Sequence, residues 1–151
     1  MGLEKLTYSG SEYNNYVYFV FDGEYYDVNA ITRELKIEPT SVKLKKDPVP
    51  KNTSWFYKIG AGKEEDLRDE IDHIVKLFMP KIDLINKLKD EFDLQTRFQF
   101  VLYVDIHPEA STPCFKLSQQ TIEFLGKTKS EVDFDLYIAD TVNLLNRMTL
   151  E

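Results

Sequence analysis

Three polar residues after one predicted strand come closest to a reactive site in this sequence. Asp105, His107 and Glu109 alternate along the chain, so in an extended backbone their side chains would point to one side. An imidazole and two carboxylates could bind a divalent metal ion or share a proton. Pro108 disturbs the alternation and only one histidine takes part. We therefore favour a polar strand end over a metal or catalytic site, and we expect no cofactor.

The other charged candidates are explained more simply by surface positions. His73 lies on the polar side of a predicted helix, at helical spacing from Asp69 and Lys76, which indicates a solvated or ion-paired histidine. Asp133 and Asp135 share one face of a predicted strand and could pair as acid and base. A solvent-facing strand is the interpretation that we favour for them.

No nucleophile or phosphate-binding loop is evident. Cys114 is the single cysteine, so it can form neither an internal disulfide nor a thiolate zinc site alone, and it lacks a neighbouring base. The segment 60–63 (GAGK) precedes a predicted helix, where anions can bind. The spacing of a phosphate loop is missing, and Glu64 and Glu65 would repel a phosphate, so we reject that interpretation.

Aromatic residues are the candidates for a surface that contacts a ligand or a partner. The chain has nine tyrosines, and five of them lie close together: Tyr13, Tyr16, Tyr18, Tyr25 and Tyr26. With Trp55 they could line a groove or anchor an interface, while packing in the core and on the sheet is the competing interpretation. We select Tyr25, Tyr26 and Trp55 as contact residues.

One long amphipathic helix is predicted between Glu64 and Phe92 and must support these sites. Its apolar residues recur at helical spacing and form one stripe: Leu67, Ile71, Ile74, Val75, Phe78, Ile82, Ile85 and Leu88. Carboxylates at 64–66 suit a helix start. Pro80 cannot donate a hydrogen bond to the preceding turn, so we expect a kink or a short break near Met79.

Strands and two shorter helices are predicted on either side of the long helix. The expected strands are Tyr16–Phe21, closed by a tight turn at Asp22-Gly23, an edge strand at Thr40–Lys45, Ser54–Ile59, a central strand at Arg97–Ile106, a short extended piece at Cys114–Leu117, and Val132–Ile138. One short helix is expected from an N-cap at Asn29 to Pro39, and the other from an N-cap at Ser118 to Gly126. Residues 141–148 could add a terminal helical turn.

The two short helices have related surroundings, which indicates a weak internal duplication around the long helix. Each unit has an extended segment, a cap, a short helix, a turn and a strand, and we expect parallel strands to pair through each short helix. The predicted fold is α+β: a ferredoxin-like or related sandwich, with a mixed sheet, one long kinked helix and two short helices. We expect one domain over residues 1–151, with either a frayed arm or an edge strand at 1–14 and a C-terminal extension at 139–151.

The composition excludes several classes of function. A formal charge of −7 opposes binding to nucleic acid, which draws its affinity from a basic surface. No stretch reaches the ~20 apolar residues that a membrane helix needs, and the N-terminal segment lacks the order of a signal peptide. We therefore expect a cytoplasmic protein that binds neither nucleic acid nor membrane.

Short motifs along the chain resemble one known family. They are Ile31-Thr32, Leu35, Ile37 and Pro39, then Trp55 and the long helix, and finally Leu117-Ser118, Leu125 and Phe134-Asp135-Leu136-Tyr137. Together they resemble the bacterial family called domain of unknown function 4279, over roughly Tyr16 to Ile138. The resemblance implies a small, stand-alone bacterial cytoplasmic α+β protein without an established activity, so no functional residue is transferred. Some small bacterial families of this kind resemble immunity proteins that neutralise toxins.

Three hypotheses about function follow. The first is a non-catalytic protein-interaction module, immunity-like in one version, whose acidic and aromatic surface binds another protein. The second is a small-ligand-binding module that uses the Tyr and Trp cluster, and the third is a metal-dependent enzyme that uses Asp105, His107 and Glu109. An exposed apolar patch with an acidic rim would favour the first, a concave aromatic pocket the second, and convergent metal ligands the third. We favour the first; the oligomeric state is left open.

Overall fold

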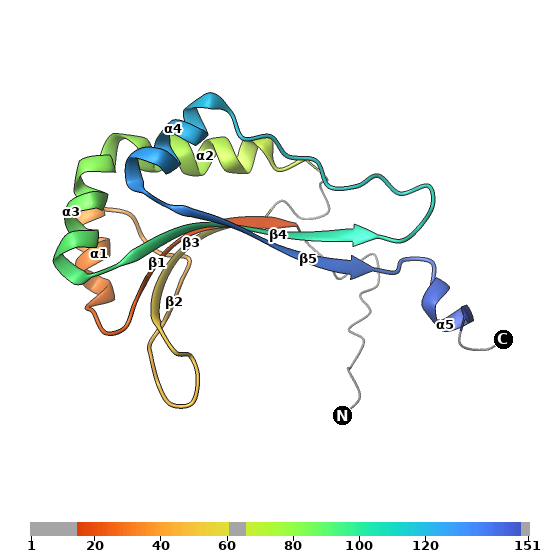
Figure 1. Cartoon of the computed structure of the whole chain (residues 1–151), viewed down its shortest axis with the longest axis horizontal. Helices are drawn as coiled ribbons and strands as arrows, with labels where there is room; N and C mark the ends of the chain where they lie inside the picture. Colours follow the sequence, from red (N-terminus) through yellow and green to blue (C-terminus); the bar gives the residue numbers. More distant parts are fainter. Residues whose placement is uncertain (1–14, 61–65, 149–151) are drawn as a thin grey trace.

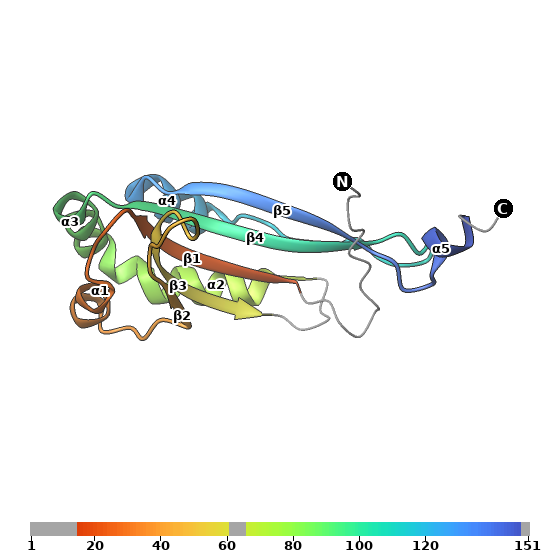
Figure 2. The ribbon, with the colours of Figure 1, turned by 90° about the horizontal axis from the view of Figure 1, so that it is seen from below.

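The computed structural model describes residues 15–60 and 66–148, which form one mixed sheet with helices on one face (Figures 1 and 2). The strands are β1 (Tyr16–Gly23), β2 (Ser41–Lys43), β3 (Thr53–Gly60), β4 (Gln95–Asp105) and β5 (Glu131–Ala139). The helices are α1 (Val28–Leu35), α2 (Arg68–Phe78), the 3-10 helix η1 (Met79–Lys81), α3 (Ile82–Phe92), α4 (Gln119–Thr128) and α5 (Leu144–Met148). The arm expected at 1–14 lies outside the described residues.

The strand order β2-β3-β1-β4-β5 confirms the predicted α+β fold. Strand β3 lies between β1 and β2 and is antiparallel to both, while β4 is antiparallel to β1 on its other side. This is the β-α-β-β-α-β order of a ferredoxin-like sheet. Helix α4 then leads to β5, which pairs parallel to β4. Parallel strands therefore pair directly through only one short helix, because β3 separates β1 from β2.

The predicted break in the long helix is confirmed. Helices α2 and α3 are separated by η1, which contains Pro80 in its first turn. Helix α2 begins at Arg68, and the start that we expected at Glu64 lies outside the described residues. Asp66 instead forms an isolated parallel bridge with Cys114, and its carboxylate accepts a hydrogen bond from the N–H of Arg68 (2.9 Å). The chain just before α2 therefore has extended pairing, which delays the first helical turn.

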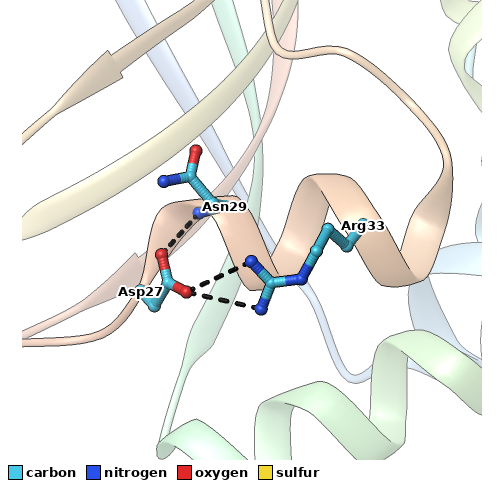
Figure 3. Close-up of polar contacts among 3 residues, drawn as sticks. All are labelled: Asp27, Asn29 and Arg33. Carbon is cyan, nitrogen blue, oxygen red and sulfur yellow. Dashed lines mark hydrogen bonds and ion pairs between the residues drawn. The ribbon is translucent and has the colours of Figure 1, made fainter.

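Helix α1 is capped two residues earlier than predicted. Asp27, and not Asn29, is the N-cap, and its Oδ1 accepts a hydrogen bond from the N–H of Asn29 (3.0 Å) (Figure 3). The other carboxylate oxygen accepts from the guanidinium of Arg33 at 3.4 Å. At the C-terminal end the helix stops at Lys36, which has a left-handed backbone (φ 55°), before Pro39 is reached.

Helix α4 begins as predicted and ends later. Ser118 accepts a hydrogen bond from the N–H of Thr121 (3.1 Å) and is the N-cap. Gly126 does not end the helix, because the left-handed cap falls on Lys129 (φ 50°). The N–H of Ser130 then donates to the carbonyl of Leu125 (2.9 Å), which satisfies an end carbonyl and offsets the cost of a left-handed lysine.

Asp22 and Gly23 continue β1 instead of forming the predicted tight turn. Gly23 pairs with Thr53 at the end of the ladder. A Cβ atom at this position would lie 2.6 Å from Cδ2 of Leu94 and 2.9 Å from Cδ1 of Tyr26. Glycine is therefore required here by close packing rather than by a turn.

The core lies between the sheet and the helices and is rich in aromatic rings. Phe19 on β1 is fully buried, and its ring centroid lies 5.0 Å from that of Phe78 on α2 and 5.5 Å from that of Phe124 on α4. Trp55 on β3 is also fully buried, and its indole N–H donates to the hydroxyl of Thr32 (3.0 Å). Phe19 thus joins the sheet to two helices.

We predict that Phe19→Ala lowers the free energy of unfolding by about 3–5 kcal/mol, because it leaves a cavity among rings that cannot close around it. Denaturant unfolding followed by circular dichroism measures this change. Ile122→Ala on the exposed side of α4 is the control and should change stability by less than about 0.5 kcal/mol. A loss below about 1 kcal/mol in Phe19→Ala would contradict this packing.

Candidate functional site

Strand β5 has the alternation of a half-buried strand, but its apolar face is exposed. Val132, Phe134, Leu136 and Ile138 point to the side of the sheet that carries the helices, yet they are 37%, 42%, 66% and 59% exposed. Figure 1 shows the reason: α2 and α4 cover only one part of the sheet, and β4 and β5 run on past them toward α5. An apolar face of this length is unusual on a protein surface.

A groove lies between this part of the sheet and the connection from β4 to α4. Residues 106–118 turn back over the same face of the sheet (Figure 1). The open depression that they border with β4 and β5 has a volume of about 390 Å³ and is lined almost entirely by apolar side chains: Leu102, Val104, Thr112, Pro113, Phe115, Phe134 and Leu136. We call these residues, together with Val132 and Ile138, the apolar groove.

Stacked phenylalanines connect the apolar groove to the core. The ring of Phe100, which is fully buried, lies 4.9 Å from that of Phe115 and 5.0 Å from that of Phe134, measured between centroids. Phe115 and Phe134 are themselves 5.4 Å apart. Stacked aromatic pairs contribute about 0.5–1.5 kcal/mol each beyond their burial, so the inner wall of the groove is held in place.

The opposite face of β5 is acidic. Glu131, Asp133 and Asp135 lie on this face, and within residues 15–60 and 66–148 none of them forms an ion pair. The nearby guanidinium of Arg97 on β4 pairs instead with Asp22 on β1 at 3.0 Å. β5 therefore presents an apolar face on one side and, on the other, carboxylates that form no ion pair among the described residues, although Arg97 is close enough to act on Asp133 electrostatically.

Asp105, His107 and Glu109 hold a loop together instead of converging on a metal ion. The carboxylate of Asp105 accepts hydrogen bonds from the N–H of His107 (3.0 Å) and from the hydroxyl of Thr141 (2.6 Å). Partial desolvation opposes ionisation of this carboxyl, but the hydrogen bonds outweigh it and lower the pKa of Asp105. Nδ1 of His107 accepts from the N–H of Glu109 (2.9 Å).

No metal site is formed in the part of the chain that the structure describes, where no three His, Cys, Asp or Glu side chains are grouped closely enough to hold an ion. His73 does not pair with Asp69 or Lys76; its Nε2 lies 3.1 Å from the hydroxyl of Tyr57, and the two rings stack. Cys114 is exposed and has a free thiol.

The three aromatic residues selected from the sequence occupy three different environments. Trp55 has no exposed surface, and Tyr26 is half-buried and donates a hydrogen bond to the carbonyl of Phe21 (2.7 Å). Burial raises the pKa of the Tyr26 phenol. Tyr25 is exposed, with the ammonium of Lys45 4.7 Å from its ring centroid. One ligand could contact all three only if the core rearranged.

The apolar groove was missed at the sequence level, although part of its signal was present. The alternation of Phe134, Leu136 and Ile138 predicted a strand with one apolar face, which the structure confirms. Alternation reports which residues share a face and does not report whether another layer covers that face. The contributions of Pro113 and Phe115 depend on the path of the loop, for which the sequence has no periodic signal.

We predict that adding Zn²⁺ or Mn²⁺ leaves the melting temperature the same as in EDTA. The reason is that Nδ1 of His107 and the carboxylate of Asp105 already accept hydrogen bonds from nearby N–H and hydroxyl groups. Differential scanning fluorimetry of the wild type and of His107→Ala provides the comparison. A metal-dependent rise in the wild type that disappears in His107→Ala would contradict this account of the loop.

Comparison with known proteins adds a family but no activity. No helix in the described part of the chain combines the length and apolarity needed to cross a membrane. No curated protein matches the chain, and no solved structure does. One family model matches residues 11–139, which include the whole sheet and the apolar groove. The chain belongs to the family described as Domain of unknown function (DUF4279).

Proposed function

We propose that this protein is a non-catalytic interaction module that binds another protein at β5 and the apolar groove. The observation that carries the proposal is the exposure of four apolar side chains on β5, an edge strand whose opposite face is acidic. Exposed apolar patches bordered by charged residues are typical of protein-binding surfaces. From the sequence, an exposed apolar patch with an acidic rim would favour a partner protein; here the apolar patch is exposed, and the acidic residues lie on the opposite face of the same edge strand.

The energetics of the apolar groove support binding. Burying one of its large side chains fully contributes about 1.5–3 kcal/mol, and Leu136 and Ile138 are the most exposed of those on β5. The stacked rings of Phe115 and Phe134 are held by Phe100, so little conformational freedom is lost there when a partner docks. A partner side chain inserted beside these rings would be a natural anchor for the interface.

The length of the apolar face favours a protein over a small molecule. From Val132 to Ile138 the strand rises about 20 Å, at roughly 3.3 Å per residue. The depression of about 390 Å³ covers only the part near Phe134 and Leu136. A small apolar ligand in that depression is the second candidate, since the volume falls within the range of ligand pockets. It would leave Val132 and Ile138 exposed.

The acidic face indicates the chemistry of the partner. Glu131, Asp133 and Asp135 would attract a basic surface and speed the encounter with it. Neutralisation of a basic protein toxin is one concrete form of this function. The cytoplasm is the compartment that we propose for this interaction, because a chain with a single cysteine has no internal disulfide of the kind that small proteins of oxidising compartments commonly use.

We predict that Leu136→Glu abolishes partner binding without unfolding the protein, because Leu136 is 66% exposed and contributes to the groove rather than to the core. A photo-crosslinking amino acid at position 136 in the native cells identifies the partner, and the same group at Ile122 on α4 gives the background. The purified partner is then titrated with the wild type, Leu136→Glu and Ile122→Glu.

The expected result is at least a roughly tenfold loss of affinity in Leu136→Glu, about 1.4 kcal/mol, and none in Ile122→Glu, which is a matched exposed apolar position. The proposal is overturned if position 136 yields no product beyond that of position 122. Equal affinity of all three proteins for the crosslinked partner would also overturn it.

A further inference from the structure

We propose that β5 binds its partner by strand addition: an extended segment with alternating apolar and basic side chains pairs with the free edge of β5 and continues the sheet. This inference rests on the proposed function and specifies how the partner is held. Peptides that add a strand gain affinity from main-chain hydrogen bonds and specificity from alternate side chains.

The edge of β5 is regular and open. Its register with β4 runs without a bulge over nine residue pairs, from Arg97 and Glu131 to Asp105 and Ala139. Among the described residues, no strand pairs with the other side of β5. Exposed edge strands are normally protected by charged side chains, lysine above all, by proline or bulges, or by a covering segment, and the only charges on β5 are its three carboxylates. β5 contains neither lysine nor proline, and all its residues except Ala139 are exposed.

The backbone of β5 shows which groups are available. The carbonyl of Ala139 accepts a hydrogen bond from Ile106, so the backbone groups of Ala139 face the β4 side (2.9 Å). The N–H of Phe134 donates instead to Oδ1 of its neighbour Asp133 (2.9 Å), so it points away from β4. Directions alternate along a strand, and the outward backbone groups therefore belong to Val132, Phe134, Leu136 and Ile138. The N–H of Phe134 is already bonded to Asp133, so the donors open to an added strand are those of Val132, Leu136 and Ile138.

Side-chain chemistry then specifies the added strand. Residues directly opposite one another on paired strands lie on the same face of the sheet. Side chains beside Phe134 and Leu136 would lie on the apolar face and extend the groove. Side chains beside Asp133 and Asp135 would lie on the acidic face, where no cation among the described residues pairs with either carboxylate. Lysine or arginine at every second position of the partner meets both requirements.

A second copy of this chain fits the edge poorly. In a two-fold antiparallel pairing, one set of registers places odd-numbered residues opposite odd-numbered ones, so Asp135 faces Asp135 or Asp133 across the interface. The other set places apolar residues opposite acidic ones and puts their side chains on the wrong faces. Both arrangements are unfavourable, whereas a basic and apolar segment is complementary in charge and in pattern.

The test uses the full chain and a synthetic seven-residue probe in which lysine alternates with valine, leucine and isoleucine. Two control peptides are used: one has the same composition with the lysines grouped together, and the other has glutamate in place of lysine. Binding is measured by fluorescence anisotropy, and amide exchange along β5 is followed by NMR. We expect the alternating basic peptide to bind at least roughly tenfold more tightly than either control.

Amide exchange separates strand addition from simple docking in the groove. Strand addition protects the outward amides of Val132, Leu136 and Ile138 when the peptide binds, while Asp135 and Tyr137 change little because their amides already face β4. The double variant Asp133→Lys with Asp135→Lys should reverse the preference from the lysine peptide to the glutamate peptide.

Leu136→Pro and Leu136→Ala form a matched pair for the backbone contribution. Both remove the leucine side chain, but only proline removes an outward N–H and blocks the edge, without loss of a bond to β4. We expect at least roughly tenfold weaker binding in Leu136→Pro than in Leu136→Ala, with similar melting temperatures. If the proline variant is unfolded, the amide-exchange result on the wild type decides the inference.

Peptide binding without new protection of the outward amides would overturn strand addition. Equal affinity for the alternating and grouped peptides, or no binding of any peptide, would also overturn it. In these cases the proposed function is tested separately, by whether the partner that crosslinks at position 136 binds Leu136→Glu more weakly than it binds the wild type. If position 136 gives no more crosslinked product than the background position 122, the proposed function itself is overturned.

Discussion

The backbone hydrogen bonds between β4 and β5 are the interaction on which the proposed binding surface depends. They attach β5 through nine consecutive residue pairs, although Ala139 is the only residue of β5 that is fully buried. Most edge strands are held by burial of one face as well as by hydrogen bonds. Here the ladder extends past the helix layer and leaves that face in water, which makes β5 a candidate binding element (Figure 2).

The two ends of the sheet are packed differently, but stacked aromatic side chains connect them. At one end, Phe19 and Trp55 pack tightly under the helices. At the other, Phe100 extends the core by stacking on Phe115 and Phe134, which form the inner wall of the apolar groove. Because these two rings pack on the buried Phe100, the inner wall of the groove is already formed in the free protein, which lowers the cost of ordering it on binding.

Much of the fold could be predicted from the sequence, because periodicity reports local structure and shared faces. The break at Pro80 and the N-cap at Ser118 are confirmed, and β4 is an interior strand as expected, although β1 and not β4 is the central strand of the sheet. The left-handed caps at Lys36 and Lys129 could not be found, since no glycine marks them. The candidate site was even less accessible, because exposure of an apolar face depends on how far the helices reach along the sheet, which no local pattern encodes.

Hydrogen exchange of the free protein, measured by NMR residue by residue, tests the central claim that the edge of β5 is open. The account predicts an alternating pattern: fast exchange at Val132, Leu136 and Ile138, and exchange slowed by pairing with β4 at Asp135 and Tyr137. Equally slow exchange at all five amides would contradict it, because the edge would then be already covered in solution.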